Sequence, residues 1–435
     1  MSSKTGWALL ARVVLPLAAA ALCLNAAPSR VADEKELTRV IEQYFEADGR
    51  TMDGRAARRA LLEEVDGLSP EPLTSAEVKK WSGVIEERWM DGRKLEKKTG
   101  SHRYWEKEKR GLYIVDGITR KPKGLLIGMH GGGVGSGDAR EAAGFLGSAA
   151  KKLKWVAIFP EVLEKTEHGW TTSGTEEWVI DLVDAARRTY GVDANQVVFA
   201  GHSMGGFGSW MLGAHHADRV ACLGPAAGAP TPYLDQNGLP EDIIEGVIPN
   251  LRNVPMRVYQ SDDDPQVPAA ANRIAVKKIA EAREKWGGYE DFEYIEDKGK
   301  GHAYPPGGGK KWLAALKKYE RDPHPKKVVW QPTLTWKLQF YWLYWETPQL
   351  RRIVEAEIDS KANTVAVTSE YETQGLWILL PDDLLKLDKE VVVTARGEEV
   401  WRGVPERRLS TLLMTGVRGD EGLTFSARVP AWKRN

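Results

Sequence analysis

A serine flanked by glycines is the first candidate for chemistry in this sequence. Ser203 lies in the stretch Gly201-His202-Ser203-Met204-Gly205, directly after the apolar run VVFA and before residues that can continue as a helix. At a sharp strand-to-helix turn, such a serine presents its hydroxyl above the sheet edge, and the glycines avoid Cβ collisions with neighbouring elements. The start of the helix adds partial positive charge, which favours a developing oxyanion. The pattern therefore predicts that Ser203 is a nucleophile.

A serine hydroxyl needs a general base, and the base needs a carboxylate that orients it. The acidic cluster Asp262, Asp263 and Asp264 follows the apolar run MRVYQS, and His302 follows the next such run, DFEYIED, between glycine-rich residues. If these runs are strands, Ser203, one aspartate and His302 each lie on a loop after a strand. Such loops share one edge of a parallel sheet, so we expect the three residues to meet there. The chain order of serine, aspartate and histidine is that of an α/β-hydrolase.

The elements that must position these residues alternate between strands and helices. Amphipathic helical stretches such as 176–190 and 269–286 separate several of the apolar runs. Strands that alternate with helices predict a mostly parallel sheet covered on both faces, here over residues 109–322. The apolar runs predicted as strands are 111–117, 124–130, 155–160, 197–203, 219–225, 256–262 and 291–297.

The two ends of the chain differ from this central region. Residues 28–108 are charged with helical spacing, and Leu37, Val40, Ile41 and Tyr44 share one helix face, which predicts two or three helices packed on the next domain. Residues 323–435 begin with a charged, proline-bearing linker and become rich in aromatic and β-branched residues. We expect a small all-β, sandwich-like domain there.

The stretch from Leu125 to His302 resembles the α/β-hydrolase superfamily. It is most similar to secreted polyhydroxybutyrate-depolymerase-like and feruloyl-esterase-like enzymes and to the prolyl-oligopeptidase catalytic domain. These families often carry the pattern Gly-x-x-Asp-x-x-Val-Pro after the strand that precedes the acid. Matched onto SDDDPQVP, the pattern implies that Asp264 is the triad acid, with Ser261 at the glycine position. Asp262 remains the alternative.

A second glycine segment supplies candidate oxyanion donors. His130 precedes Gly131, Gly132 and Gly133 after the apolar run LLIG, and this segment resembles the HGGG segment of lipases and esterases. The resemblance implies an oxyanion hole made of the Met204 amide and one or two amides of the three glycines. A phosphate-binding loop is the rival interpretation, but the segment lacks the Lys-Ser/Thr ending of a P-loop.

Less specific signals bear on the pocket and on metals. Trp170 and His168 follow the predicted strand 155–160 at the functional edge, so they are candidates for a pocket wall, with an ordinary connecting loop as the alternative. His215 and His216 are adjacent on a predicted helix and would point about 100° apart, which is unsuited to one metal ion. The spacing of cysteine and histidine does not match a zinc site, so we expect neither a metal nor a cofactor.

The N-terminus predicts export. Lys4 and Arg12 precede an apolar run too short to span a bilayer comfortably, and small residues follow it, which is typical of a signal peptide over residues 1–27. An uncleaved signal that anchors the protein to a membrane is the alternative. Cleavage would leave Cys222 as the single cysteine of a periplasmic or extracellular protein, without an intramolecular disulfide and without stable membrane insertion.

Composition limits the partners. The 61 basic and 61 acidic residues give a formal net charge of zero, so nothing favours a nucleic-acid partner. We expect a small-molecule or polymeric ester as substrate, and the sequence does not fix the oligomeric state.

The sequence thus predicts a secreted serine hydrolase that forms an acyl-enzyme. The predicted activity is that of a carboxylic ester hydrolase, and a prolyl-oligopeptidase-type peptidase is the alternative. A different class of hypothesis is a polymer- or carbohydrate-binding protein with a secondary or inactive hydrolase core. It depends on four tryptophans close together in the C-terminal region, Trp330, Trp336, Trp342 and Trp345. Aromatic residues occupy both parities of TWKLQFYWLYWE, so some rings must face away from the sandwich core if this stretch is a strand. A helix or an interdomain contact would bury these rings instead.

Overall fold

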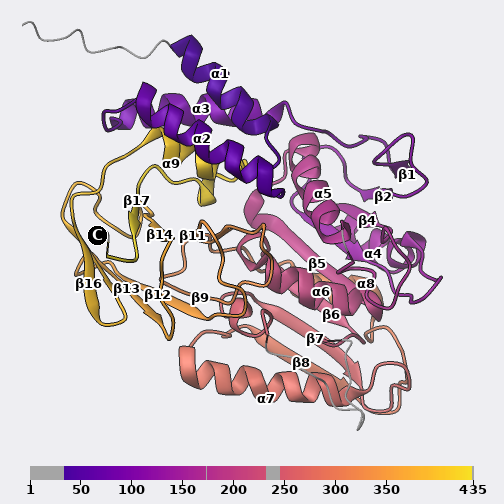
Figure 1. Cartoon of the computed structure of the whole chain (residues 1–435). Coiled ribbons are helices and arrows are strands. Elements are labelled where there is room, and N and C mark those ends of the chain that lie inside the picture. The colour runs from indigo at the N-terminus through magenta and orange to yellow at the C-terminus, as the bar shows by residue number, and fades with distance from the viewer. Residues whose placement is uncertain (1–33, 173, 232–244, 434–435) are drawn as a thin grey trace, which may run out of the picture.

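The computed structural model describes residues 34–172, 174–231 and 245–433 (Figure 1). The predicted signal peptide, residues 1–27, lies outside the described residues. Within these ranges no helix combines the length and the apolar character needed to cross a membrane.

An eight-stranded sheet forms the centre of the protein, in the order β1-β2-β4-β3-β5-β6-β7-β8. The six strands from β4 to β8 in this order are parallel, whereas β1 and β2 are antiparallel to their neighbours. All seven apolar runs form strands, which confirms the predicted mostly parallel sheet. An eighth strand, β1, lies within the range predicted to be helical. The strands are β1 Gly100–Arg103, β2 Leu112–Gly117, β3 Leu125–Met129, β4 Val156–Pro160, β5 Val197–His202, β6 Cys222–Ala226, β7 Met256–Ser261 and β8 Phe292–Asp297.

Helices cover both faces of this sheet. Every residue of β3, β4, β5 and β6 is buried, as expected for strands with helices on both sides. Side chains of α5, α6 and α7 join the apolar core on one face, and those of α4 and α8 join a second core on the other. These helices are α4 Ala139–Leu153, α5 Thr175–Tyr190, α6 Met204–His215, α7 Ala269–Trp286 and α8 Gly308–Leu316.

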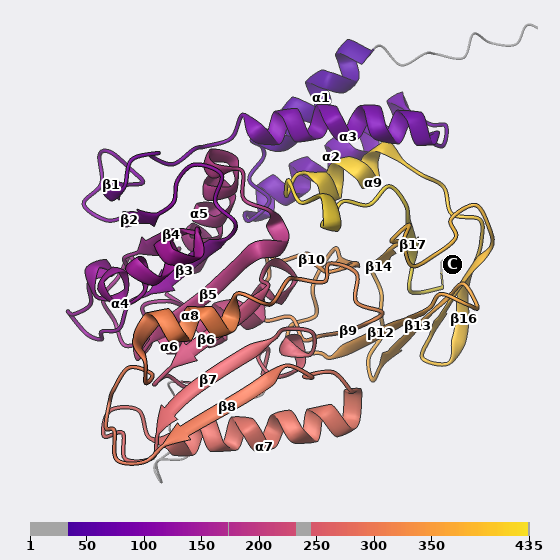
Figure 2. The same cartoon turned by 180° about the vertical axis from the view of Figure 1, so that it is seen from behind.

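The N-terminal helices are α1 Glu34–Glu46, α2 Met52–Leu68 and α3 Ser75–Met90. The face of α1 predicted from the sequence is buried, but its apolar core is completed by Leu409, Leu412 and Leu413 of α9 (Leu409–Gly416). Figures 1 and 2 show α9, in yellow, directly against these helices. The helices also pack on the following domain as expected, since Arg187 and Arg188 of α5 lie over the Trp89 ring of α3. Their main apolar partner, however, comes from the other end of the chain.

The C-terminal region contains two further sheets, in the orders β10-β11-β14-β17 and β16-β15-β13-β12-β9. It is largely β structure as predicted, yet it also contains α9 and one parallel pair, β13 with β15. A turn at Arg396-Gly397 joins β15 to β16 as a hairpin. The strands are β9 Lys327–Trp330, β10 Gln339–Phe340, β11 Leu343–Trp345, β12 Val354–Asp359, β13 Thr364–Ser369, β14 Leu376–Leu379, β15 Val391–Ala395, β16 Glu398–Gly403 and β17 Arg428–Pro430.

The aromatic-rich stretch is part of the core. The hairpin of β10 and β11 turns at Tyr341 and Trp342, so aromatic rings of both parities find buried surroundings. Trp330, Trp342 and Trp345 are at most 1% exposed, and the indole N–H groups of Trp342 and Trp345 donate to the carbonyl oxygens of Pro325 and Gln374. Three of the four tryptophans behind the polymer-binding hypothesis therefore cannot form a surface platform.

Candidate active site

Ser203 occupies a strained turn between β5 and α6. Its backbone φ is +59° and ψ is −125°, a region that non-glycine residues rarely adopt. A Cβ on Gly201 would collide with the backbone of Gly205, and one on Gly205 would collide with the carbonyl oxygen of Met129. The two glycines are thus needed for the close approach of β3, β5 and α6, as the motif predicts.

Asp264 is the aspartate of the acidic cluster that contacts His302. Its buried Oδ2 lies 2.8 Å from His302 Nδ1, and its Oδ1 accepts 2.9 Å hydrogen bonds from the amides of Gln266 and Val267. The Gln260 amide group also donates to Asp264 Oδ2. Because this carboxylate is held by its own loop, it can fix the orientation of the imidazole and leave Nε2 for proton transfer.

The other two aspartates shape the loop that carries His302. Asp262 Oδ1 accepts a hydrogen bond from the Gly299 amide, and Asp263 Oδ1 accepts one from the Gly301 amide. The hydrogen bond from the Ser261 hydroxyl lowers the pKa of Asp263, and the one from the Gly301 amide lowers it further. Asp262 therefore serves the loop and does not contact the imidazole.

The three candidate residues meet at one edge of the central sheet. Ser203 follows β5, Asp264 follows β7 and His302 follows β8, and these strands are parallel. The His302 ring lies 4.8 Å from that of His202, the neighbour of Ser203, measured between ring centroids. The structure thus places Ser203, Asp264 and His302, the three residues that the sequence predicts, at one edge of the sheet, with Asp264 and His302 in contact.

The glycine segment lies against Ser203, but its three amides are not equivalent. A Cβ on Gly131 would lie 3.1 Å from Ser203 Cβ, so the segment borders the nucleophile. The Gly131 amide donates to Glu141 Oε2 at 2.9 Å, and the Gly133 amide faces the Ser136 carbonyl at 3.5 Å. Within the part of the chain that the structure describes, the Gly132 amide has no hydrogen-bond acceptor. Gly131 is therefore an anchor of the segment, and Gly132 is the better candidate for an oxyanion donor beside Met204.

His130 and Trp170 support this segment from the protein interior. Val162 donates its amide to His130 Nε2, so Nδ1 carries the proton and donates to the Gly131 carbonyl at 2.6 Å. Burial lowers the pKa of His130, which keeps the ring neutral. The Trp170 indole, which is fully buried, donates to the His130 carbonyl. Trp170 is therefore a support of the glycine segment, and its predicted role as a pocket wall is corrected.

His168 remains a candidate for a pocket wall. It is half-buried, and its ring centroid is 6.2 Å from that of Phe207, which lies in the first turn of α6 after Ser203.

Glu141 and Tyr304 are members of the site that the sequence analysis missed. Glu141 lies in the first turn of α4, and its Oε1 accepts a 2.5 Å hydrogen bond from the Tyr304 hydroxyl. The Tyr304 ring stacks on His202 with centroids 4.0 Å apart. Partial burial would raise the pKa of Glu141, but the contacts with His202 and Tyr304 outweigh it and lower the pKa. Burial and the Glu141 carboxylate raise the pKa of Tyr304, which keeps the phenol protonated as a donor.

His215 and His216 share a carboxylate, contrary to the argument from helical spacing. Glu176 Oε1 lies 2.8 Å from His215 Nδ1 and 2.9 Å from His216 Nε2. The two rings can converge because α6 ends at His215 and the backbone of His216 leaves the helix. The described ranges contain no cluster of three or more acidic, histidine or cysteine side chains arranged to hold a metal ion.

The strand order, the serine turn and the loop positions of aspartate and histidine define this fold as that of an α/β-hydrolase. No protein family model matches the chain. It is similar to the bifunctional acetylxylan esterase/xylanase XynS20E of Neocallimastix patriciarum, with 25% identity over 154 residues that span 31% of this chain. The chain covers 22% of the length of that relative.

Solved structures with a similar fold include other esterases. A thermostable esterase is 18% identical, with a TM-score of 0.39, and the match covers 52% of this chain and 63% of that chain. An acetyl xylan esterase from Aspergillus awamori is 13% identical, with a TM-score of 0.37, and the match covers 47% of this chain and 92% of that chain.

Proposed function

We propose that this protein is a serine hydrolase that cleaves carboxylic esters through an acyl-enzyme. The observation that carries the proposal is the 2.8 Å contact between buried Asp264 and His302, on the edge where Ser203 is held at a positive φ. A strained serine, an oriented imidazole and a glycine segment beside them supply the groups that acyl transfer requires.

The proposed reaction begins when His302 Nε2 accepts the Ser203 proton while Oγ attacks the ester carbonyl carbon. The amides of Gly132 and Met204 stabilise the oxyanion of the tetrahedral intermediate, and Asp264 stabilises the imidazolium. When the intermediate collapses, the bond to the leaving alkoxide breaks and His302 donates its proton to that oxygen. Water then attacks the acyl-enzyme by the same steps and releases the acid.

Short acyl esters are the proposed substrates, and acetyl esters come first. The relative in Neocallimastix patriciarum is described as an acetylxylan esterase, which makes acetylated polysaccharide a reasonable first polymer to test. A peptidase would use the same triad, but the named relatives are esterases. We therefore include peptidase substrates in the test and expect no turnover of them.

The decisive test combines covalent labelling with turnover. A fluorophosphonate probe should label the protein and should not label Ser203→Ala, and the same substitution should lower kcat on p-nitrophenyl acetate on the order of 10⁵-fold or more. Equal labelling of both proteins, or of neither, would overturn the proposal. Turnover of aminoacyl p-nitroanilides without turnover of esters would favour the peptidase.

We also propose that the protein is exported, on the basis of the residue pattern of the N-terminus. Expression of the full chain followed by cell fractionation should release a protein without residues 1–27, with intact mass as the readout. Recovery of the full-length mass in the membrane fraction would support the anchored alternative.

A further inference from the structure

A cavity lies away from the candidate active site. It has a volume of about 760 Å³ and lies among the N-terminal helices, α5 and the C-terminal region. Its lining includes His216, which directly follows α6, whereas Ser203 directly precedes that helix. A helix of 12 residues is about 18 Å long, so the cavity and Ser203 lie at opposite ends of α6. The volume falls within the range of small-molecule sites.

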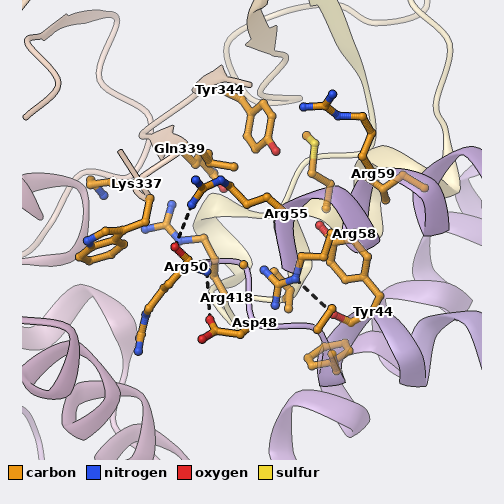
Figure 3. Close-up of a pocket in the computed structure, with 18 of the residues that line it drawn as sticks. Tyr44, Asp48, Arg50, Arg55, Arg58, Arg59, Lys337, Gln339, Tyr344 and Arg418 are labelled. Carbon is orange, nitrogen blue, oxygen red and sulfur yellow. Dashed lines mark hydrogen bonds between the residues drawn. The ribbon is translucent and has the colours of Figure 1, made fainter. Parts of the chain in front are cut away.

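The cavity is rich in guanidinium groups. Figure 3 shows Arg55, Arg58 and Arg59 of α2 on one side of the space, with Tyr344 and Gln339 of the C-terminal region facing them. The basic residues of the lining are Arg50, Arg55, Arg58, Arg59, Arg188, Arg219, Lys337, Arg418 and Arg428, and the acidic ones are Glu46, Asp48, Glu63, Asp66, Asp181, Asp184 and Glu346. The basic residues thus outnumber the acidic ones by nine to seven.

Several acidic groups are already committed to other partners. Asp181 pairs with Arg50 at 3.0 Å, and Asp184 pairs with Arg219. Lys337 and Arg418 pair with buried Asp218 just behind the lining, at 2.7 and 2.8 Å. Of the lining carboxylates, Asp66 accepts from the Ser410 hydroxyl and Glu346 from the Trp377 indole.

Five arginines of the lining have no carboxylate within ion-pair distance among the described residues. Arg55 donates to the Arg50 carbonyl, and Arg58 donates to the Tyr44 carbonyl and lies 4.9 Å above the Tyr44 ring. Arg428 is half-buried, lies 4.3 Å from the Trp377 ring centroid and contacts Met414 Sδ. Arg59 is exposed on the same helix as Arg55 and Arg58. Arg188 of α5 donates to the Arg93 carbonyl and lies 4.6 Å from the Trp89 ring centroid.

A partly buried cation without a counterion is unfavourable, because it loses hydration without gaining an ion pair. Burial lowers the pKa of Arg428, because the lost hydration outweighs the nearby charges of Glu346 and Asp66, which raise it. The planar guanidinium matches the oxygens of carboxylate and phosphate groups in a bidentate manner. Three guanidinium groups from one helix and a fourth from β17 are therefore suited to an anion that carries more than one such group.

We propose that this cavity binds a small organic polyanion, with carboxylate or phosphate groups held by Arg55, Arg58, Arg59 and Arg428. The site joins α2, at one end of the chain, to β17, at the other. Binding there would therefore stabilise the contact between the N-terminal helices and the C-terminal region. The proposal does not depend on the function proposed for Ser203.

The test uses the full chain and two probes, citrate for carboxylates and pyrophosphate for phosphates. Isothermal titration calorimetry should detect saturable binding of one or both, and the affinity should fall as salt is added. The double variant Arg55→Gln/Arg59→Gln should weaken binding by tenfold or more. Arg120→Gln, on an exposed residue outside the cavity, is the matched control and should bind as the unmodified protein does.

Two further variants keep the test independent of folding and of the proposed enzyme. Arg428→Lys keeps the charge but loses the fork, so it should fold and bind more weakly. Ser203→Ala should bind both probes unchanged. Binding of citrate alone or of pyrophosphate alone would support the site and identify its group. Absence of saturable binding to both at about 1 mM, or equal binding by the double variant, would overturn it.

Discussion

The Glu141 carboxylate accepts a 2.9 Å hydrogen bond from the Gly131 amide, and its other oxygen accepts one from Tyr304. Glu141 and Tyr304 are 163 positions apart, and Tyr304 lies two residues after His302. One side chain thus connects the glycine segment to the loop that carries the candidate base. We infer that Glu141 positions the segment while itself remaining outside the reaction.

The substitution Glu141→Gln tests this role. A glutamine side chain has one acceptor oxygen, so it cannot accept from both Gly131 and Tyr304 as the carboxylate does. We expect kcat for p-nitrophenyl acetate to fall by roughly 10-fold to 100-fold, less than the loss of a whole oxyanion donor, with a smaller change in KM.

Tyr304→Phe should reproduce part of this loss, since it removes one of the two hydrogen bonds. Glu167→Gln, on an exposed glutamate of the loop after β4, is the control and should keep full activity. An unchanged kcat in Glu141→Gln, including the case in which only KM increases, would contradict a positioning role.

The choice of triad acid gives a second prediction. Asp264→Asn should lower kcat by about 10⁴-fold, because an amide in this position favours the wrong tautomer of His302. Asp262→Asn should retain most of the activity, since Asp262 accepts a hydrogen bond from the Gly299 amide and does not contact the imidazole. The measurement is ester hydrolysis at saturating substrate, after circular dichroism has shown that both variants fold. Similar activities of the two variants would reject Asp264 as the acid.

The sequence was most informative where a local pattern and the fold coincide. Buried parallel strands are continuous apolar runs, and each ends at a polar or glycine-rich loop, so all seven predicted runs are strands of the central sheet. The serine turn was predictable because Gly201 and Gly205 are needed by the local backbone. Asp264 and His302 could be placed together because strands of a parallel sheet end at one edge.

Features that depend on contacts distant in sequence were not predictable in the same way. Glu141 resembles any acidic residue in the first turn of a helix, and only the three-dimensional structure brings it next to Gly131 and Tyr304. The helix α9 is short, and its role as partner of α2 and α3 depends on how the two chain ends meet. The indole of Trp170 has an interior partner, the His130 carbonyl, that no spacing rule reveals.

The turn at Ser203 gives a third prediction, on stability. Gly205→Ala places a Cβ against the Met129 carbonyl oxygen, which belongs to the backbone and cannot move aside cheaply. We expect the free energy of unfolding to fall by about 1–3 kcal/mol or more. Gly144→Ala is the matched control, because Gly144 is exposed within α4 and a Cβ there meets no atom within 4 Å. That variant should gain up to about 1 kcal/mol from helix propensity. Urea unfolding of both proteins checks the sign, and equal midpoints would contradict the steric argument.

The pair of histidines on Glu176 gives a prediction about pH. Burial lowers the pKa of His216 to about 4, against the opposing effect of Glu176. Burial alone would raise the pKa of Glu176, but His215 and His216 lower it to about 2. As the pH falls from 6.5 towards 4, the unfolded chain protonates His216 while the folded protein does not, so folding is progressively disfavoured. From about pH 4.5 to 2, Glu176 adds to this loss, because the unfolded chain protonates the carboxylate first.

Urea unfolding at pH 7, 5.5 and 4.5 measures this effect. The unmodified protein should lose on the order of 3 kcal/mol or less from His216 over this interval, since a shift from 6.5 to about 4 sets the upper limit. In His216→Gln, the titrating group is absent, so the free energy of unfolding should depend less steeply on pH. His102→Gln, on a histidine of β1 outside the Glu176 cluster, should keep the slope of the unmodified protein. If His216→Gln and His102→Gln show the same slope, the acid sensitivity over this interval does not arise from buried His216.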